Sequence, residues 1–162
     1  MGVHIERMKE ADGKEIIQIF NHYIENGFAA YLENKVDDSF FVHFLGASKG
    51  YPSYVVRYGD AVLGFGMLHP YHPFPAFRRA AEVSYFIAPG STGQGIGSLL
   101  LERLTTDAKG MGVDCLLASI SSRNEGSIRF HLRNGFTECG RFLSVGRKFG
   151  QDFDTVWMQK RI

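Results

Sequence analysis

The feature that most constrains this chain is a run of alternating glycines, Gly93, Gly95 and Gly97, directly ahead of a leucine-rich stretch. The apolar residues of that stretch recur four positions apart: Ile96, Leu100, Leu104 and Ala108. This spacing predicts a helix with one buried face. Because glycine is a poor helix former, three glycines at a helix start indicate that a ligand must come close to the backbone there.

The segment ahead of the glycines, AAEVSYFIAP at 80–89, predicts a strand that Pro89 ends. A strand, a glycine-rich turn and a helix together present unpaired N–H groups and the positive end of the helix dipole. The ligand that suits this arrangement is a phosphate. Two common phosphate motifs are excluded, because a nucleotide P-loop needs a lysine after Gly97 and the dinucleotide fingerprint needs a glycine where Ser98 stands.

The composition is that of one globular domain. The 162 residues are 44% hydrophobic and 22% charged, with a formal net charge of +1, so we expect a single domain over residues 1–162. So small a net charge gives no electrostatic reason to bind nucleic acid or an anionic membrane, and we expect neither partner.

Several patterns bear on location and metal binding. No apolar run approaches the ~20 residues of a membrane helix, and the N-terminal MGVHIERMKE carries charges where a signal peptide is apolar. Cys115 and Cys139 are too few for a disulfide framework and match no zinc motif. His69 and His72 lack a third ligand at a suitable spacing. We therefore expect a cytoplasmic protein without a bound metal.

The remaining patterns predict alternating strands and helices. The predicted elements are, in order, a strand at 3–8, helices at 12–24 and 37–50, a hairpin at 51–68, a strand at 80–89, a helix at 96–108, a strand at 113–120, a helix at 124–135 and strands at 136–146 and 152–161. We expect Asp12 to cap the first helix, and Ile128 and Leu132 to form the buried stripe of the last. The order predicts an α/β (α+β) fold with a mixed, mostly antiparallel central sheet and helices on both faces.

Two motifs resemble signatures of the GNAT acyltransferase superfamily. The sequence TGQGIG at 92–97 is similar to that family's pyrophosphate loop, usually Gln/Arg-x-x-Gly-x-Gly/Ala, although Thr92 stands where most relatives have Arg or Gln. The sequence SSRNEGSIRFHLRNGF at 121–136 resembles the second signature, Asn-x-x-Ala/Ser-Ile-x-x-Tyr/His-x-x-x-Gly-Phe. The two motifs lie in the family's order and separation. The resemblance implies the GNAT fold and acetyl-CoA as cosubstrate.

The resemblance also implies which residues hold the cofactor. Asn124 would hydrogen-bond the pantetheine or phosphate region, and His131 occupies the position of the residue that protonates the departing thiolate. The expected cofactor-binding residues are Phe86, Ile87, Ala88, Thr92, Gly93, Gln94, Gly95, Ile96, Gly97, Ser98, Asn124 and Ser127.

Four further stretches are similar to the phosphinothricin and methionine-sulfoximine N-acetyltransferase branch. They are IFNHYIENG, GYPSYVV, PFPAFRRAAEVSYFI and VGRKFGQDFDTVWMQ. Members of that branch acetylate the α-amine of small amino-acid-like molecules and commonly form dimers, so the resemblance implies a homodimer.

This sequence departs from the branch on the acceptor side. Asn26-Gly27-Phe28-Ala29-Ala30 replaces the hydroxyl-rich Asn-Thr-Thr-Ala stretch, and His72 stands where relatives often have Arg. The expected acceptor-binding residues are Phe28, Tyr31, His72, Phe74 and Arg78.

Acetylation of an amine needs a base, a polarised thioester carbonyl and a proton for the thiolate. Glu82, on the strand face shared with Ser84 and Phe86, is the candidate base; an ion pair with Arg78 or Arg79 is the structural alternative. A backbone N–H at Phe86 or Ile87 is the candidate carbonyl donor. His131 is the candidate acid, with a packed ring as its alternative.

Two other functions remain open at this point. The acceptor is a polyamine or a protein N-terminus in the first. In the second, the protein is a non-catalytic acyl-CoA-binding module, and Glu82 and His131 have structural roles.

Overall fold

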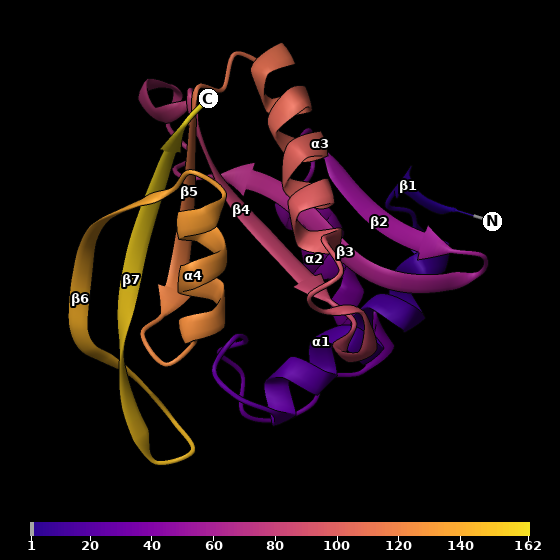
Figure 1. The fold of residues 1–162 in the computed structure, drawn as a ribbon, viewed down its shortest axis with the longest axis horizontal. Coiled ribbons are helices and arrows are strands. Elements are labelled where there is room, and N and C mark those ends of the chain that lie inside the picture. Colours follow the sequence, from indigo (N-terminus) through magenta and orange to yellow (C-terminus); the bar gives the residue numbers. More distant parts are fainter. Residues whose placement is uncertain (1) are drawn as a thin grey trace.

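The computed structural model describes residues 2–162, and these contain seven strands in one sheet (Figure 1). The strands are β1 (Val3–Arg7), β2 (Ser53–Tyr58), β3 (Ala61–Pro70), β4 (Ala80–Ile87), β5 (Cys115–Ser121), β6 (Thr137–Lys148) and β7 (Gln151–Arg161). Their spatial order is β1-β2-β3-β4-β5-β7-β6. The β4–β5 pair is parallel, and the other five pairs are antiparallel.

Helices cover both faces of the sheet. They are α1 (Gly13–Glu25), α2 (Phe41–Ala47), α3 (Ile96–Gly110) and α4 (Glu125–Arg133), with short 3₁₀ turns η1 (Glu10–Asp12), η2 (Asp38–Phe40), η3 (Pro75–Phe77) and η4 (Pro89–Ser91). Helix α3 packs in one apolar cluster and α1 and α2 in another. The order of strands and helices and the mixed, mostly antiparallel sheet agree with the prediction from the sequence.

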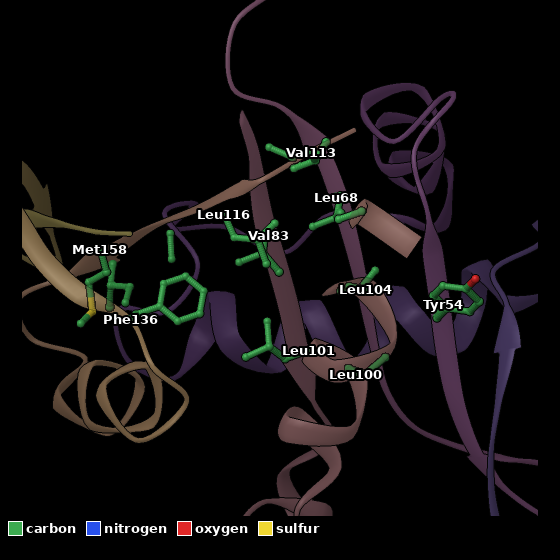
Figure 2. Close-up of a cluster of buried hydrophobic side chains, with 14 of the residues drawn as sticks. Tyr54, Leu68, Val83, Leu100, Leu101, Leu104, Val113, Leu116, Phe136 and Met158 are labelled. Carbon is green, nitrogen blue, oxygen red and sulfur yellow. The ribbon is translucent and has the colours of Figure 1, made fainter. Parts of the chain in front are cut away.

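The larger core lies between α3 and the sheet (Figure 2). The predicted stripe of α3 is buried along its whole length, since Ile96, Leu100, Leu104 and Ala108 are each at most 4% exposed. Figure 2 shows Leu100 and Leu104 gathered against the strands that carry Leu68 and Val83. Burial of this stripe, at roughly 1.5–3 kcal/mol for each large aliphatic side chain, fixes α3 and the glycine loop ahead of it on the sheet.

Two local predictions were wrong. Asp12 does not cap α1, because its buried carboxylate accepts hydrogen bonds from the Lys9 N–H at 2.8 Å and the Arg57 guanidinium at 2.5 Å. Leu132 does not belong to a buried stripe, since it is 53% exposed and His131 is the buried residue of α4. In both cases a partner on a distant strand, Arg57 or Tyr85, decides the orientation.

The sheet opens between its two parallel strands. Pairing of β4 with β5 ends at Glu82 and Leu117, although β4 continues to Ile87 and β5 to Ser121. Figure 1 shows the two strands side by side at the top of the view and diverging towards the bottom. The second half of β4 therefore has a strand partner on one side only, and this opening positions the candidate site.

Candidate active site

A cavity of about 1100 Å³ occupies the opening between β4 and β5. Its lining comes from both faces of the sheet: α1, the 29–32 loop and α2 on one side, and the glycine loop, α3 and α4 on the other. Both resembling motifs, 92–97 and 121–136, contribute to it. Residues far apart in the sequence thus meet around one half-open cavity, which is large enough to hold a ligand.

The glycine loop shapes the end of the cavity at α3. Gly93 and Gly95 have φ of 74° and 81°, a left-handed conformation that favours glycine, and a Cβ added at either would meet no atom within 4 Å. The first helical bond is donated by the Leu99 N–H to the Gly95 carbonyl at 3.0 Å. The N–H groups ahead of Leu99 therefore have no partner within the helix, and they form the backbone cradle that a phosphate requires.

Gly97 has a different role from the other two glycines. A Cβ at Gly97 would lie 3.1 Å from the ring of Phe130, so its glycine allows α4 to pack closely on α3. Gly97 thus brings the two signature motifs together.

Ten of the twelve expected cofactor-binding residues line the cavity, and Ala88 and Gln94 do not. The Ala88 N–H donates to Leu63 O at 2.8 Å, and the Gln94 carboxamide donates to Gly90 O at 3.0 Å. Asn124 lines the cavity and also caps α4, since its Oδ1 accepts the Ser127 N–H at 3.3 Å.

The end of β4 points a backbone amide, that of Ile87, toward the opening. Because the Ala88 N–H points to β3, and successive residues of a strand alternate in direction, the Ile87 N–H points away from β3. The Ile87 carbonyl points the same way, since it accepts the Tyr23 hydroxyl of α1 at 2.5 Å. Of the two candidate carbonyl donors, Ile87 is thus the one that faces the opening, and Phe86 is not.

Glu82 lies where the two strands separate and lines the cavity. Burial raises the pKa of its carboxyl, and the neighbouring His69 counteracts this pKa shift in part. His69 lies on β3 directly opposite Glu82 in the antiparallel ladder, and its Nε2 lies 3.4 Å from the Ser84 hydroxyl. An ionisable carboxyl with a raised pKa inside a cavity is suited to accept a proton near neutral pH.

The alternative role of Glu82, an ion pair with Arg78 or Arg79, was wrong. Arg79 forms its ion pair with Asp114, with Nε 3.0 Å from Oδ2. Arg78 ends η3 and is exposed. Within residues 2–162 no ion pair involves Glu82, which leaves its carboxylate free to act on a ligand.

His131 is 3% exposed and both of its ring nitrogens are hydrogen-bonded. Nδ1 lies 2.7 Å from the Ser127 carbonyl, which can only accept, so Nδ1 carries the proton. Nε2 then accepts the hydroxyl of Tyr85, which stacks on the imidazole. Burial lowers the pKa of His131 and raises that of Tyr85, so both side chains are neutral.

The expected acceptor residues are mostly outside the cavity. Of the five, only Tyr31 is among the lining residues, beside Ser119 and Glu82. His72 packs against Phe74 and Phe77, with ring centroids 4.9 and 4.7 Å away.

Phe28 lies elsewhere again. It packs between Phe149 and Phe153, with ring centroids 6.0 and 5.9 Å away, on the side of the β6–β7 hairpin. Apart from Tyr31 of the 29–32 loop, the acceptor side is therefore formed by other residues, which come from α1, η2, α2, β3 and β4.

Lys148 is a residue that sequence reasoning missed. It is 1% exposed, and its Nζ donates to Gly27 O at 2.8 Å and to Ala30 O at 2.7 Å, with Tyr23 O at 3.4 Å. Burial lowers the pKa of this amine. Lys148 therefore ties the β6–β7 hairpin to the end of α1 and to the loop that lines the acceptor side.

The sequence profile of the family described as "Acetyltransferase (GNAT) family" matches residues 16–136. The chain belongs to the GNAT family of acetyltransferases. The fold, the enzyme class and the acetyl-CoA cosubstrate that the two motifs implied are thereby confirmed.

Relatives of this GNAT chain are similar along nearly its whole length. It is 32% identical to the L-methionine sulfoximine/L-methionine sulfone acetyltransferase of Salmonella typhimurium, over 94% of this chain and 91% of that protein. The crystal structure of ribosomal-protein-alanine N-acetyltransferase from Brucella melitensis has a TM-score of 0.91 at 35% identity, covering 98% of this chain and 99% of that one. A phosphinothricin acetyltransferase from Sinorhizobium meliloti, in complex with acetyl-CoA, has a TM-score of 0.92 at 28% identity, covering 100% and 89%.

None of the helices in residues 2–162 combines the length and apolarity needed to span a bilayer. Over the same residues, no three or more His, Cys, Asp or Glu side chains cluster as a metal site would require.

Proposed function

We propose that this protein transfers the acetyl group of acetyl-CoA to the amino group of a small amino-acid-like acceptor, by direct attack in a ternary complex. The observation that carries the proposal is that a half-buried carboxyl (Glu82), an unpaired amide (Ile87) and the glycine cradle (93–97) share one cavity. Relatives named for methionine sulfoximine and phosphinothricin support the acceptor class.

Glu82 serves as the base. An ammonium is not nucleophilic, so its proton must leave before the nitrogen attacks the thioester carbon. Glu82 takes that proton directly or through a water molecule. The new C–N bond forms as the C–S bond breaks, and the Ile87 N–H stabilises the negative charge that develops on the carbonyl oxygen.

His131 acts on the thiolate through Tyr85 rather than directly. Because His131 is neutral at rest, Nε2 first takes up a proton from solvent. Nε2 then donates this proton to the Tyr85 oxygen while the Tyr85 hydroxyl donates its own proton to the sulfur, so the imidazolium returns to imidazole and the thiolate becomes thiol. The stacked pair has the contacts for this relay. Tyr85→Phe should then slow acetyl transfer to an acceptor by roughly tenfold, whereas transfer to the same acceptor from an acetyl thioester with a more acidic thiol should be far less affected.

The protein forms a cytoplasmic homodimer through β6. This strand ends the sheet, and Phe142, Leu143 and Val145 on it are 59%, 74% and 59% exposed. An apolar edge strand of this kind is favourable for pairing with a second copy. Light scattering should give twice the chain mass, and Leu143→Lys should give the monomer.

Release of free thiol from acetyl-CoA tests the activity itself. The acceptor panel holds methionine sulfoximine, methionine sulfone, phosphinothricin, ordinary amino acids, spermidine and a short peptide with a free N-terminus. Turnover of single amino-acid-like amines that Glu82→Gln abolishes supports the proposal. Turnover of the peptide alone would assign the protein to acetylation of protein N-termini. Tight acetyl-CoA binding without any turnover would indicate a binding module.

A further inference from the structure

The part of the cavity on the α1 and α2 side of Glu82 has an apolar lining, which we call the apolar arm. It is formed by Phe20, Tyr23, Phe40, Phe44, Met67 and Phe86. Phe20 is central to it, with ring centroids 5.0 Å from Phe44 and 5.3 Å from Phe86. The arm therefore presents rings and a thioether to whatever lies beyond the reacting nitrogen.

The polar atoms beside the apolar arm already have partners. The Tyr23 hydroxyl donates to Ile87 O at 2.5 Å, and the Ser84 hydroxyl lies 3.4 Å from His69 Nε2. A polar group placed in the arm would lose its hydration without gaining a hydrogen bond, which costs about 1–3 kcal/mol. An apolar group there would gain contacts without that cost.

The charges of the cavity are arranged unevenly. Among its lining residues, Glu82 is the carboxylate and Arg133 is the guanidinium. Arg133 ends α4 beside Asn134, which lies with Ser98 of the first turn of α3 around a second, smaller cavity. Arg133, the permanently charged cation, thus lies at the end of the cavity next to the glycine loop and α3, which we call the cofactor end.

The opposite end of the cavity, on the α1 and α2 side of Glu82, is called the acceptor end. It has no lysine or arginine among its lining residues. Arg78, the residue expected to hold an acceptor carboxylate, is exposed and outside the cavity. A negative Glu82 attracts a cationic amine and repels a carboxylate next to that amine.

We propose that the preferred acceptor is a primary amine with an apolar or aromatic body, and that an α-carboxylate is dispensable for its recognition. The amine lies at Glu82, and the apolar body fills the arm between α1, α2 and β4. This inference rests on the proposed N-acetyltransferase function and specifies which amines it accepts.

Two matched pairs of acceptors test the inference, with kcat/KM measured by thiol release. Phenethylamine should be acetylated at least as well as phenylalanine, which adds only the carboxylate. Methionine should exceed methionine sulfoximine by about tenfold or more, since the two differ chiefly in the polarity at sulfur. A tenfold preference for phenylalanine, or for the sulfoximine, overturns the inference and leaves the proposed function intact.

A pair of variants on one helix tests the location. Phe44→Ser should lower kcat/KM for phenethylamine by about tenfold or more without changing the affinity for acetyl-CoA, measured by calorimetry. Val42→Ser, 63% exposed on the same helix and outside the cavity lining, is the control and should leave both values unchanged. Equal kcat/KM values for the two variants overturn the assignment to the arm. Acetyl-CoA binding without acetylation of any amine would instead overturn the proposed function.

Discussion

The two ends of the cavity are built in different ways. The cofactor end is made of backbone: left-handed glycines, the open N-terminus of α3 and an unpaired amide of β4. The acceptor end is made of side chains that six segments bring together, from α1, the 29–32 loop, η2, α2, β3 and β4. Backbone geometry tolerates few substitutions, whereas side chains are replaced one at a time. The comparison indicates that this scaffold keeps its cofactor and can change its acceptor.

The largest effect is expected where the two ends meet. Glu82→Gln should lower kcat by ~10²-fold or more because it removes the base, while the dissociation constant for acetyl-CoA stays the same. Steady-state kinetics and calorimetry give the two quantities. Glu138→Gln, an exposed carboxylate on β6 outside the cavity, is the matched control. Loss of cofactor affinity in Glu82→Gln would show that the two ends are not separable.

A substitution at the cofactor end should lower the affinity for acetyl-CoA. Gly95→Val forces a branched side chain into φ 81° and into the space above the cradle, at a strain cost of about 1–3 kcal/mol. We expect acetyl-CoA affinity to fall by about 30-fold or more in calorimetry. Gly140→Val, at a glycine of β6 with ordinary φ and open space around it, should bind normally. Equal affinity in the two variants would mean that the cradle does not hold the ligand.

The acceptor end should respond to a residue outside it. Lys148→Met removes the donor to the Gly27 and Ala30 carbonyls, so the 29–32 loop loses its tie to β6. We expect the KM for the acceptor to rise by about tenfold while acetyl-CoA affinity is unchanged, because unmade buried hydrogen bonds of this kind cost about 1–3 kcal/mol. Lys148→Arg should restore part of the loss. An unchanged acceptor KM in Lys148→Met would show that the loop position does not depend on this amine.

The smallest effect is a displacement along the pH axis. Burial raises the pKa of Glu82 from its ordinary value, and a base works in its ionised form. The activity should therefore rise with pH through that raised pKa, at higher pH than a solvent-exposed glutamate would give. A kcat profile from pH 5 to 9 measures it, with Glu82→Gln as the control that lacks this rise. A profile that is already flat from pH 5 upwards would contradict the burial of this carboxyl.

The sequence predicted the cofactor end better than the acceptor end, for a physical reason. The glycines at 93–97 and the stripe of α3 are local patterns, since backbone conformation and helical periodicity are set by neighbouring residues. Phe44 and Met67 enter the apolar arm only through packing between distant elements, and nothing in their own neighbourhood marks them. The same holds for Tyr85, since no local pattern indicates its bond to His131.

The predicted acceptor residues show the limit of transfer from a resemblance. His72 and Arg78 were expected in the pocket because of their position in a similar motif. In this chain the loop closes on its own aromatic rings instead, as His72 packs on Phe74 and Phe77. Arg78, the next residue after Phe77, lies outside the cavity as well.

The early end of the β4–β5 pairing has a thermodynamic consequence for the empty protein. Beyond Glu82 the edge of β4 that faces β5 makes no ladder bonds to it, so this edge is free to pair with a ligand in the opening. Ligand that binds only the folded state adds about 2.7 kcal/mol of stability when its concentration is 100 times its dissociation constant. The lifetime of this protein against proteolysis should therefore increase with the acetyl-CoA concentration. Amide hydrogen exchange at Ile87 should report the fraction of protein molecules that have acetyl-CoA bound.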